Sequence, residues 1–201
     1  MRDSVRAAFI PFTTRFEGRV PWMYEDIDRG ITVGLGCLLT SLAQAQGLPW
    51  QDMAGGPATA DSVAWSWGQV RGATYLATHG GAAYETLSNV RLSNDAIDAL
   101  AMQRLAAEEA IVSGLAGYEA APAPAGLAIL GMAWACGAEG VLRGFPRFCA
   151  AFSRGDWGTC ALECRMDDSH NPGLTPRNRA TSALFAACLD SADPDSVPVV
   201  W

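Results

Sequence analysis

Residues 16–40 read FEGRVPWMYEDIDRGITVGLGCLLT, and the interpretation of the whole chain starts from this stretch. Apolar residues alternate with Thr and Gly from Ile31 to Gly36, which is the period of a β-strand with one apolar face. The residues before Ile31 end in Gly30, and a three-residue loop with glycine at its last position is a common hairpin connection. The stretch therefore predicts two short strands around a loop at residues 28–30.

This hairpin would gather polar side chains on one face. A loop at residues 28–30 places Asp26 directly opposite Thr32, and opposed residues have Cβ atoms about 5 Å apart. A carboxylate and a hydroxyl in that arrangement could hold a water molecule. Gly34 and Gly36 leave the same face without side chains, so we expect that a ligand can approach the backbone there.

A second carboxyl group precedes the hairpin. Glu17 lies nine positions before Asp26, next to Phe16 and after an apolar run. A carboxyl group against apolar side chains can act as an acid, whereas one in a polar hairpin stays ionised. Two carboxyl groups in unlike environments are what glycoside hydrolysis needs. The alternative is that both are ordinary solvated surface groups.

The spacing is Glu, eight residues, Asp, five residues, Thr, and then Val-Gly-Leu-Gly-Cys-Leu-Leu-Thr. This pattern resembles the catalytic signature of the phage-type lysozymes (endolysins). That family usually reads Thr-Ile-Gly-x-Gly-His after the hairpin, and here Cys37 stands in place of the histidine. The resemblance implies that Glu17, Asp26 and Thr32 are the catalytic residues.

The resemblance covers roughly residues 1–40 and 92–190. It implies an α+β, mainly helical chain with a lysozyme-like two-lobed fold, in which a long helix joins a small β-hairpin lobe to a larger helical lobe. Residues 1–201 would form one such domain. Its expected parts are a small lobe at about 17–92 with an enlarged segment at 47–90, a linking helix at about 94–114, and a helical lobe at about 115–190 that includes the N-terminal helix.

Hydrophobic periodicity and capping residues predict the helices. Val5, Phe9 and Phe12 recur at helical spacing, and Ser93 or Asn94 suits a helix cap. The stretch from Gly126 is apolar almost all round and predicts a central buried helix. The expected helices are residues 2–16, 38–46, a piece that starts at 59–61, 94–114, 126–136, 157–166, and 175–188 with Thr175 as cap and Pro176 in first position.

The implied activity is cleavage of the bond between N-acetylmuramic acid and N-acetylglucosamine in peptidoglycan, with inversion at the anomeric carbon. Glu17 would protonate the glycosidic oxygen. Asp26 would stabilise positive charge at the anomeric carbon and, with Thr32, orient the attacking water. No metal and no organic cofactor is implied.

Four further residues are assigned supporting or substrate-binding roles. Arg179 aligns with a family arginine that pairs with the catalytic glutamate across the lobes, and Arg177 is the competitor for that role. The other three are Gly34, Gly36 and Tyr24, which lie in the hairpin stretch near Asp26 and Thr32.

Composition limits the functional classes. With 201 residues and a hydrophobic fraction of 50%, the chain is long and apolar enough to bury a sizeable core. Its net charge of −7 argues against nucleic-acid binding, and it is unusual for an enzyme that acts on cell walls, which are often anionic. The longest apolar stretch, residues 127–136, is too short to span a bilayer, so membrane insertion is not expected.

The expected partner is peptidoglycan, and a secretion carrier or an immunity protein could bind the chain as well. The chain is expected to be a monomer. No signal peptide is recognisable near the start, so we expect synthesis in the cytoplasm and action in the periplasm or cell wall after delivery by a holin or a secretion system. Six cysteines without a CxxC pair, and two histidines, leave little for a zinc site. Most of the cysteines are expected to be small buried residues, and a disulfide formed after delivery stays open.

Two other functional readings remain. The chain could be a catalytically weak peptidoglycan-binding module of a larger toxin or virion protein, or a chitinase of related fold. Aromatic residues are concentrated in segment 47–90, where they would either stack on sugar rings or fill the core of a small lobe: Trp50, Trp65, Trp67, Tyr75 and Tyr84.

Overall fold

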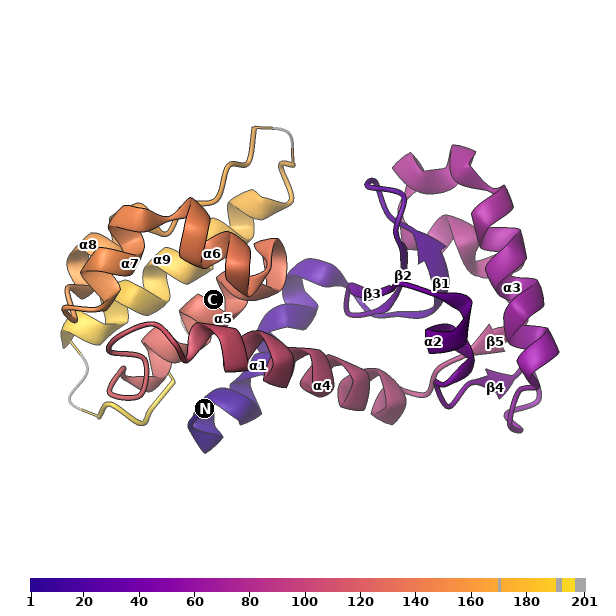
Figure 1. Cartoon of the computed structure of the whole chain (residues 1–201), viewed down its shortest axis with the longest axis horizontal. Helices are drawn as coiled ribbons and strands as arrows, with labels where there is room; N and C mark the ends of the chain where they lie inside the picture. The colour runs from indigo at the N-terminus through magenta and orange to yellow at the C-terminus, as the bar shows by residue number, and fades with distance from the viewer. Residues whose placement is uncertain (170, 191–192, 198–201) are drawn as a thin grey trace. The chain divides into compact units, whose positions relative to one another are not determined.

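The computed structural model describes residues 1–169, 171–190 and 193–197. The chain is α+β and mainly helical, with two small antiparallel sheets, as the sequence predicts (Figure 1). It divides into two compact units. The hairpin unit is Glu17–Gln103, and the helical unit is Met1–Phe16 with Arg104–Trp201.

The hairpin unit contains both sheets. A three-stranded antiparallel sheet has the order β1-β2-β3, and a two-stranded sheet pairs β4 with β5. Two α-helices and two 3₁₀ helices, η1 and η2, complete the unit, together with the first part of α4. The bounds are β1 (Val20–Glu25), β2 (Ile31–Gly34), β3 (Cys37–Leu39), α2 (Leu42–Gln46), β4 (Gln51–Asp52), α3 (Ala60–Gly72), η1 (Thr74–His79), η2 (Gly81–Leu87), β5 (Val90–Arg91) and α4 (Asn94–Val112).

The predicted register of the β1–β2 hairpin is wrong by two residues. Tyr24, not Asp26, lies opposite Thr32. The turn begins one residue earlier than predicted, because Asp26 N–H donates to Gly30 O at 2.9 Å. Arg29, and not Gly30, therefore takes the left-handed conformation, at φ 68°. Side chains alternate between faces with a period of two, so a two-residue slip leaves each of them on its predicted face.

The start of the second helix also differs from the prediction. Residues 37–39 form β3 and extend the sheet, so α2 begins at Leu42 and not at residue 38. Ser41 caps α2, because its Oγ accepts a hydrogen bond from Gln44 N–H at 3.1 Å. Strands β4 and β5 were not predicted, since two-residue strands are too short to show an alternating pattern.

Two other helix starts in this unit are confirmed. Thr59 caps α3 through a hydrogen bond that its side chain accepts from Ser62 N–H. Of the two caps considered for α4, Ser93 is the one in place: its Oγ accepts a hydrogen bond from Ala96 N–H at 3.1 Å. Both follow the preference for a hydroxyl at the residue before a helix.

The aromatic residues of segment 47–90 divide between core and surface. Trp50 and Tyr84 are buried, and the Trp50 indole donates to Ala45 O at 2.7 Å. Trp65 and Tyr75 are exposed at 49% and 71%. The core interpretation is therefore confirmed for Trp50 and Tyr84, and the sugar-platform interpretation remains open only for the exposed rings.

The described residues of the helical unit form the N-terminal helix, the second part of α4 and five further helices. Both α5 and α8 pack against α9 (Figure 1). Buried side chains line α5 along most of its length, which confirms the predicted central helix. The bounds are α1 (Asp3–Glu17, of which residues 3–16 belong to this unit), α5 (Ala123–Cys136), α6 (Ala138–Gly144), α7 (Pro146–Phe152), α8 (Trp157–Glu163) and α9 (Leu174–Asp190).

Aromatic side chains hold the helical unit together. The rings of Phe9 and Trp134 meet edge to face at 5.2 Å, and the Arg104 guanidinium lies 4.0 Å from the centre of the Trp134 ring. Phe148 and Phe185 form a second edge-to-face pair at 5.4 Å. Such contacts add about 0.5–1.5 kcal/mol each to the burial of the rings themselves.

Several boundaries in this unit correct the prediction. α5 begins at Ala123, because Pro124 is accepted in the first turn of a helix instead of ending a loop. α6 was not predicted, and α8 ends at Glu163. α9 begins at Leu174, so Thr175 lies inside the helix and its hydroxyl donates to Asp168 Oδ2 at 2.7 Å. That hydrogen bond, followed by one from Arg165, lowers the pKa of Asp168.

Among the described residues, no single helix is long and apolar enough to cross a membrane, although α5 and α6, bent by 100° at their junction, pass the same length and composition criteria as a pair. The sequence also predicts a loose tail after residue 190, and residues 191, 192 and 198–201 of that tail lie outside the described residues.

Candidate functional site

Asp26 is held in place by the turn that it helps to form. Its Oδ1 accepts hydrogen bonds from Gly30 N–H at 2.8 Å and Asp28 N–H at 3.0 Å. Its Oδ2 accepts one from the Thr32 hydroxyl at 3.0 Å. An aspartate side chain that binds backbone N–H groups two and four residues ahead stabilises a tight turn. Both carboxylate oxygens are therefore fixed in position by hydrogen bonds.

Thr32 and Asp26 meet across a diagonal of the hairpin and not directly, since Tyr24 is the residue opposite Thr32. Diagonal neighbours on one face are about 7–8 Å apart at Cα, within reach of two polar side chains. The predicted meeting of Asp26 with Thr32 is thus confirmed, although the predicted register is wrong. Thr32 is 3% exposed.

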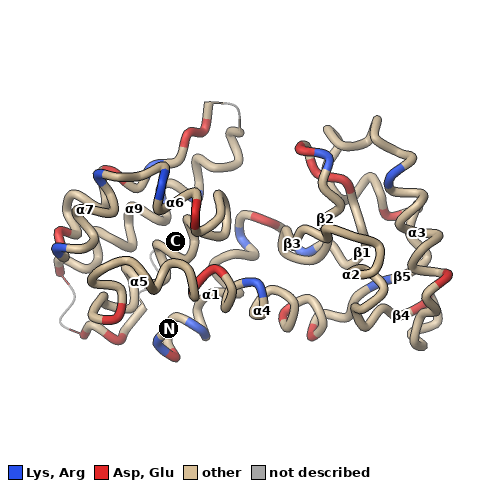
Figure 2. The backbone as a smooth tube through the Cα atoms, in the orientation of Figure 1, with Lys and Arg blue, Asp and Glu red and all other residues tan. Residues whose placement is uncertain are grey.

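Gly30 is needed for a different reason from the predicted one. A Cβ atom there would lie 2.9 Å from Asp26 Oδ2 and 2.5 Å from Leu38 Cδ1. The absence of a side chain leaves room for the Asp26 carboxylate. Figure 2 shows acidic and basic residues side by side at this end of the hairpin.

Glu17 lies where helix α1 ends and the hairpin unit begins. Gly18, in the left-handed conformation at φ 69°, follows the last helical residue, as is common at helix ends. Glu17 Oε2 lies 3.0 Å from the position that a Cβ atom on Gly36 would occupy. The turn between β2 and β3 therefore passes close to the carboxyl group, and Gly36 has the left-handed φ of 79° that this turn requires.

Gly34 does not have the predicted role. It is buried, and a Cβ atom on it would lie 3.2 Å from Ile97 Cγ2 of α4. Its missing side chain lets α4 pack against the sheet and does not leave a bare surface for a ligand.

Tyr24 is half-buried with its ring against Gly81 of η2, and its contact with substrate stays a prediction.

Cys37, at the position of the family histidine, is paired with Val33 in the sheet and is 3% exposed. None of the six cysteines forms a disulfide. Cys37, Cys160 and Cys164 are buried, Cys149 and Cys188 are half-buried and Cys136 is exposed, so the prediction of burial holds for three of the six. Among the described residues, no group of three or more histidine, cysteine or acidic side chains is placed to hold a metal ion.

The two arginines at the start of α9 have opposite environments. Arg179 is exposed, and the Arg177 side chain is buried at 1% exposure. Arg177 Nη1 donates to Gly131 O at 3.0 Å, and its guanidinium lies 4.9 Å from the ring centre of Phe16, the residue before Glu17. The predicted pairing of Arg179 with Glu17 stays a prediction, and burial favours Arg177 for an internal role.

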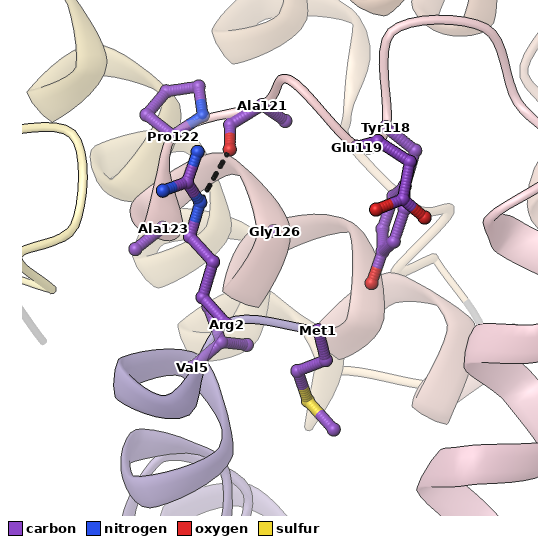
Figure 3. A pocket seen from close by; sticks show the side chains of 9 residues that line it. All are labelled: Met1, Arg2, Val5, Tyr118, Glu119, Ala121, Pro122, Ala123 and Gly126. Carbon is purple, nitrogen blue, oxygen red and sulfur yellow. Dashed lines mark hydrogen bonds between the residues drawn. The ribbon is translucent and has the colours of Figure 1, made fainter.

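A hollow in the helical unit contains none of the predicted site residues (Figure 3). It has a volume of about 320 Å³ and lies beside the start of the chain, where Arg2 Nε donates to Ala121 O at 3.1 Å. Burial, and next the charge of Glu109, raise the pKa of Tyr118 on its wall. Its residues offer no pair of carboxyl groups for acid–base chemistry.

Comparison with protein-family models and with curated proteins finds no match to this chain. The resemblance to phage-type lysozymes therefore stays an expectation from the sequence.

Proposed function

We propose that the chain is a peptidoglycan glycan-strand hydrolase, a muramidase that cleaves between N-acetylmuramic acid and N-acetylglucosamine. The observation that carries the proposal is the hydrogen bond from Thr32 to Asp26 in a hairpin whose next turn passes against the Glu17 carboxyl group. One unit thus contains two carboxyl groups and a hydroxyl. These are the groups that an inverting glycosidase uses.

In this proposal Glu17 is the general acid that protonates the leaving glycosidic oxygen. Asp26, fixed by its three donors, stabilises positive charge at the anomeric carbon. The Thr32 hydroxyl gives its only proton to Asp26, so its oxygen accepts a hydrogen bond from the attacking water. The water is thereby oriented for attack on the face opposite to the leaving group.

The proposal also assigns a fold family. The helical unit and the hairpin unit would be the two lobes of a lysozyme-like fold, with α4 as the linking helix. Delivery to the periplasm or cell wall by a holin or a secretion system, for phage lysis or for attack on a competitor, belongs to the same proposal.

The test is hydrolysis of purified cell walls by the full chain. We expect loss of turbidity, release of reducing ends, and a first product with the α-anomeric configuration in proton NMR, since inversion of a β-glycosidic bond gives the α-anomer. Release of amino groups without reducing ends would contradict the proposal. Binding to walls without any reducing ends would support the weak binding module, and cleavage of pure chitin at a similar rate would support the chitinase.

A further inference from the structure

The hairpin unit contains a polar pocket on the face of its sheet opposite to Thr32. Glu25 lies opposite Ile31 in the register, and neighbouring residues of a strand point to opposite faces. Glu25 and Ile31 therefore face away from Thr32. The pocket has a volume of about 330 Å³ and is lined by Glu25, Arg29, Ile31, Arg71 and Thr74.

Glu25 is the unusual residue of this pocket, because its carboxylate is buried and only half satisfied. The residue is 4% exposed. Its Oε1 lies 3.4 Å from Arg29 Nη1, but its Oε2 is buried without a hydrogen-bond partner among the described residues. A buried carboxylate oxygen without a donor is destabilising, and such groups in folded proteins usually have an identifiable role. A ligand that brings a donor to Oε2 would remove this penalty.

The two arginines of the pocket differ in how they are engaged. Arg29 Nη1 donates to Thr74 O at 2.6 Å, which anchors Arg29 to the start of η1. Arg71, in the last turn of α3, is exposed and has no ion pair among the described residues. Two guanidinium groups against one carboxylate leave the pocket with an excess of one positive charge. Arg71 is thus available to a carboxylate, which a guanidinium binds through two parallel hydrogen bonds.

We propose that this pocket binds an α-amino carboxylate, with the ammonium group directed to Glu25 and the carboxylate to Arg71. A simple anion would leave Glu25 Oε2 without a donor, and a simple amine would leave Arg71 without an acceptor. If the proposed function holds, the source in the cell wall is the free end of the diamino acid in an uncross-linked peptide stem.

Calorimetry on the full chain can test the required pair of charges. The probes are meso-2,6-diaminopimelate, which carries the α-amino carboxylate, glutarate, which lacks the ammonium, and 1,5-diaminopentane, which lacks the carboxylate. We expect measurable binding of the first and at least about 10-fold weaker binding of the other two, since each lacks one charge-assisted hydrogen-bonding group.

Variants separate the two ends of the ligand. Glu25→Gln should weaken diaminopimelate binding at least about 10-fold without weakening glutarate, and Arg71→Gln should weaken both. Arg143→Gln removes an arginine that is 82% exposed in the helical unit, and it should change nothing. Thermal melts check that each variant is folded. Absence of diaminopimelate binding, equal binding of glutarate, or equal losses in all three variants would overturn the proposal.

A sedimentation assay with cell walls tests the source of the ligand. It uses Glu17→Gln protein, which should leave the walls intact. Acetylation of the free amino groups of the walls should reduce co-sedimentation, whereas unchanged co-sedimentation would assign the pocket to free amino acids and overturn the wall source. The proposed function fails separately: walls hydrolysed without diaminopimelate binding overturn the pocket alone, and binding without hydrolysis overturns the muramidase alone.

Discussion

The Thr32 hydroxyl donates a hydrogen bond of 3.0 Å to Asp26 Oδ2, although the two residues are not opposite each other in the hairpin. The same carboxylate binds two backbone N–H groups through its other oxygen. A carboxylate held by three donors has little freedom to turn. Such fixed charges and dipoles contribute most to transition-state stabilisation, because they do not have to reorganise during the reaction.

Glu17→Gln should reduce wall hydrolysis by at least about 1,000-fold, because an amide cannot donate the proton that the leaving group needs. The thermal melt should not change appreciably. Reducing-end release is the measurement, and Glu139→Gln, at an exposed position of α6, is the control for loss of one carboxylate. A folded Glu17→Gln protein that retains more than a few per cent of activity would exclude Glu17 as the acid.

Thr32→Ser should retain most of the activity, whereas Thr32→Val should lose about 100-fold, within the range for one group that positions a reacting proton or water. Valine has nearly the shape of threonine, but it can neither donate to Asp26 nor accept from water. Because Thr32 is buried, Thr32→Glu should be inactive through crowding and repulsion by Asp26. Equal rates for the serine and valine proteins would show that the hydroxyl is not used.

Gly36→Ala should reduce activity much more than Gly34→Ala, at similar cost in stability. Both glycines are left-handed, at φ 79° and 69°, so each alanine should destabilise the fold by about 1–2 kcal/mol. Only the Cβ atom at position 36 meets Glu17, at 3.0 Å from Oε2, whereas that at position 34 meets Ile97. Thermal melts and hydrolysis rates of both proteins are the measurements. A parallel loss of activity in the two variants would show that Glu17 tolerates displacement.

Arg177→Ala should lower both stability and activity, while Arg179→Ala should affect neither strongly. Removal of the buried Arg177 leaves Gly131 O without its donor and the ring of Phe16 without its partner, a loss of about 2–3 kcal/mol. Because Phe16 precedes Glu17 in α1, the acid should lose its fixed position as well. Arg177→Lys, measured in the same melts and rates, should recover part of both losses. A greater loss of activity in folded Arg179→Ala would restore the role predicted from the sequence.

Buried thiols should make the protein less stable in alkali. Burial raises the pKa of Cys160 to about 12 and that of Cys164 to about 11, above the usual value of 9.0. The unfolded chain therefore releases these protons first, so this stabilisation is complete below pH 9 and is lost between pH 9 and about 12. Melting temperatures across this range are the measurement. Cys160→Ala should make the decline less steep, and an unchanged slope would contradict the assignment.

The local sequence was sufficient for features that depend on residues close together in the chain. The α+β, mainly helical class, the apolar helix around Gly126, and the caps at Thr59 and Ser93 follow from periodicity and from side chains that bind nearby backbone groups. The meeting of Asp26 with Thr32 also follows, because a register shifted by two residues keeps each side chain on its predicted face.

Only the tertiary structure decided what depends on partners distant in the sequence. The register of the hairpin is a separate case: it depends on local hydrogen bonds of the Asp26 side chain to its own turn, which the alternation of apolar residues does not reveal. Gly34 and Gly36 look equivalent in the sequence, yet one accommodates Ile97 and the other Glu17. Arg177 and Arg179 are likewise two similar residues on one helix, and residues two apart point about 200° away from each other. Which of them is buried depends on the neighbours Phe16 and Gly131, and these are brought to α9 by folding alone.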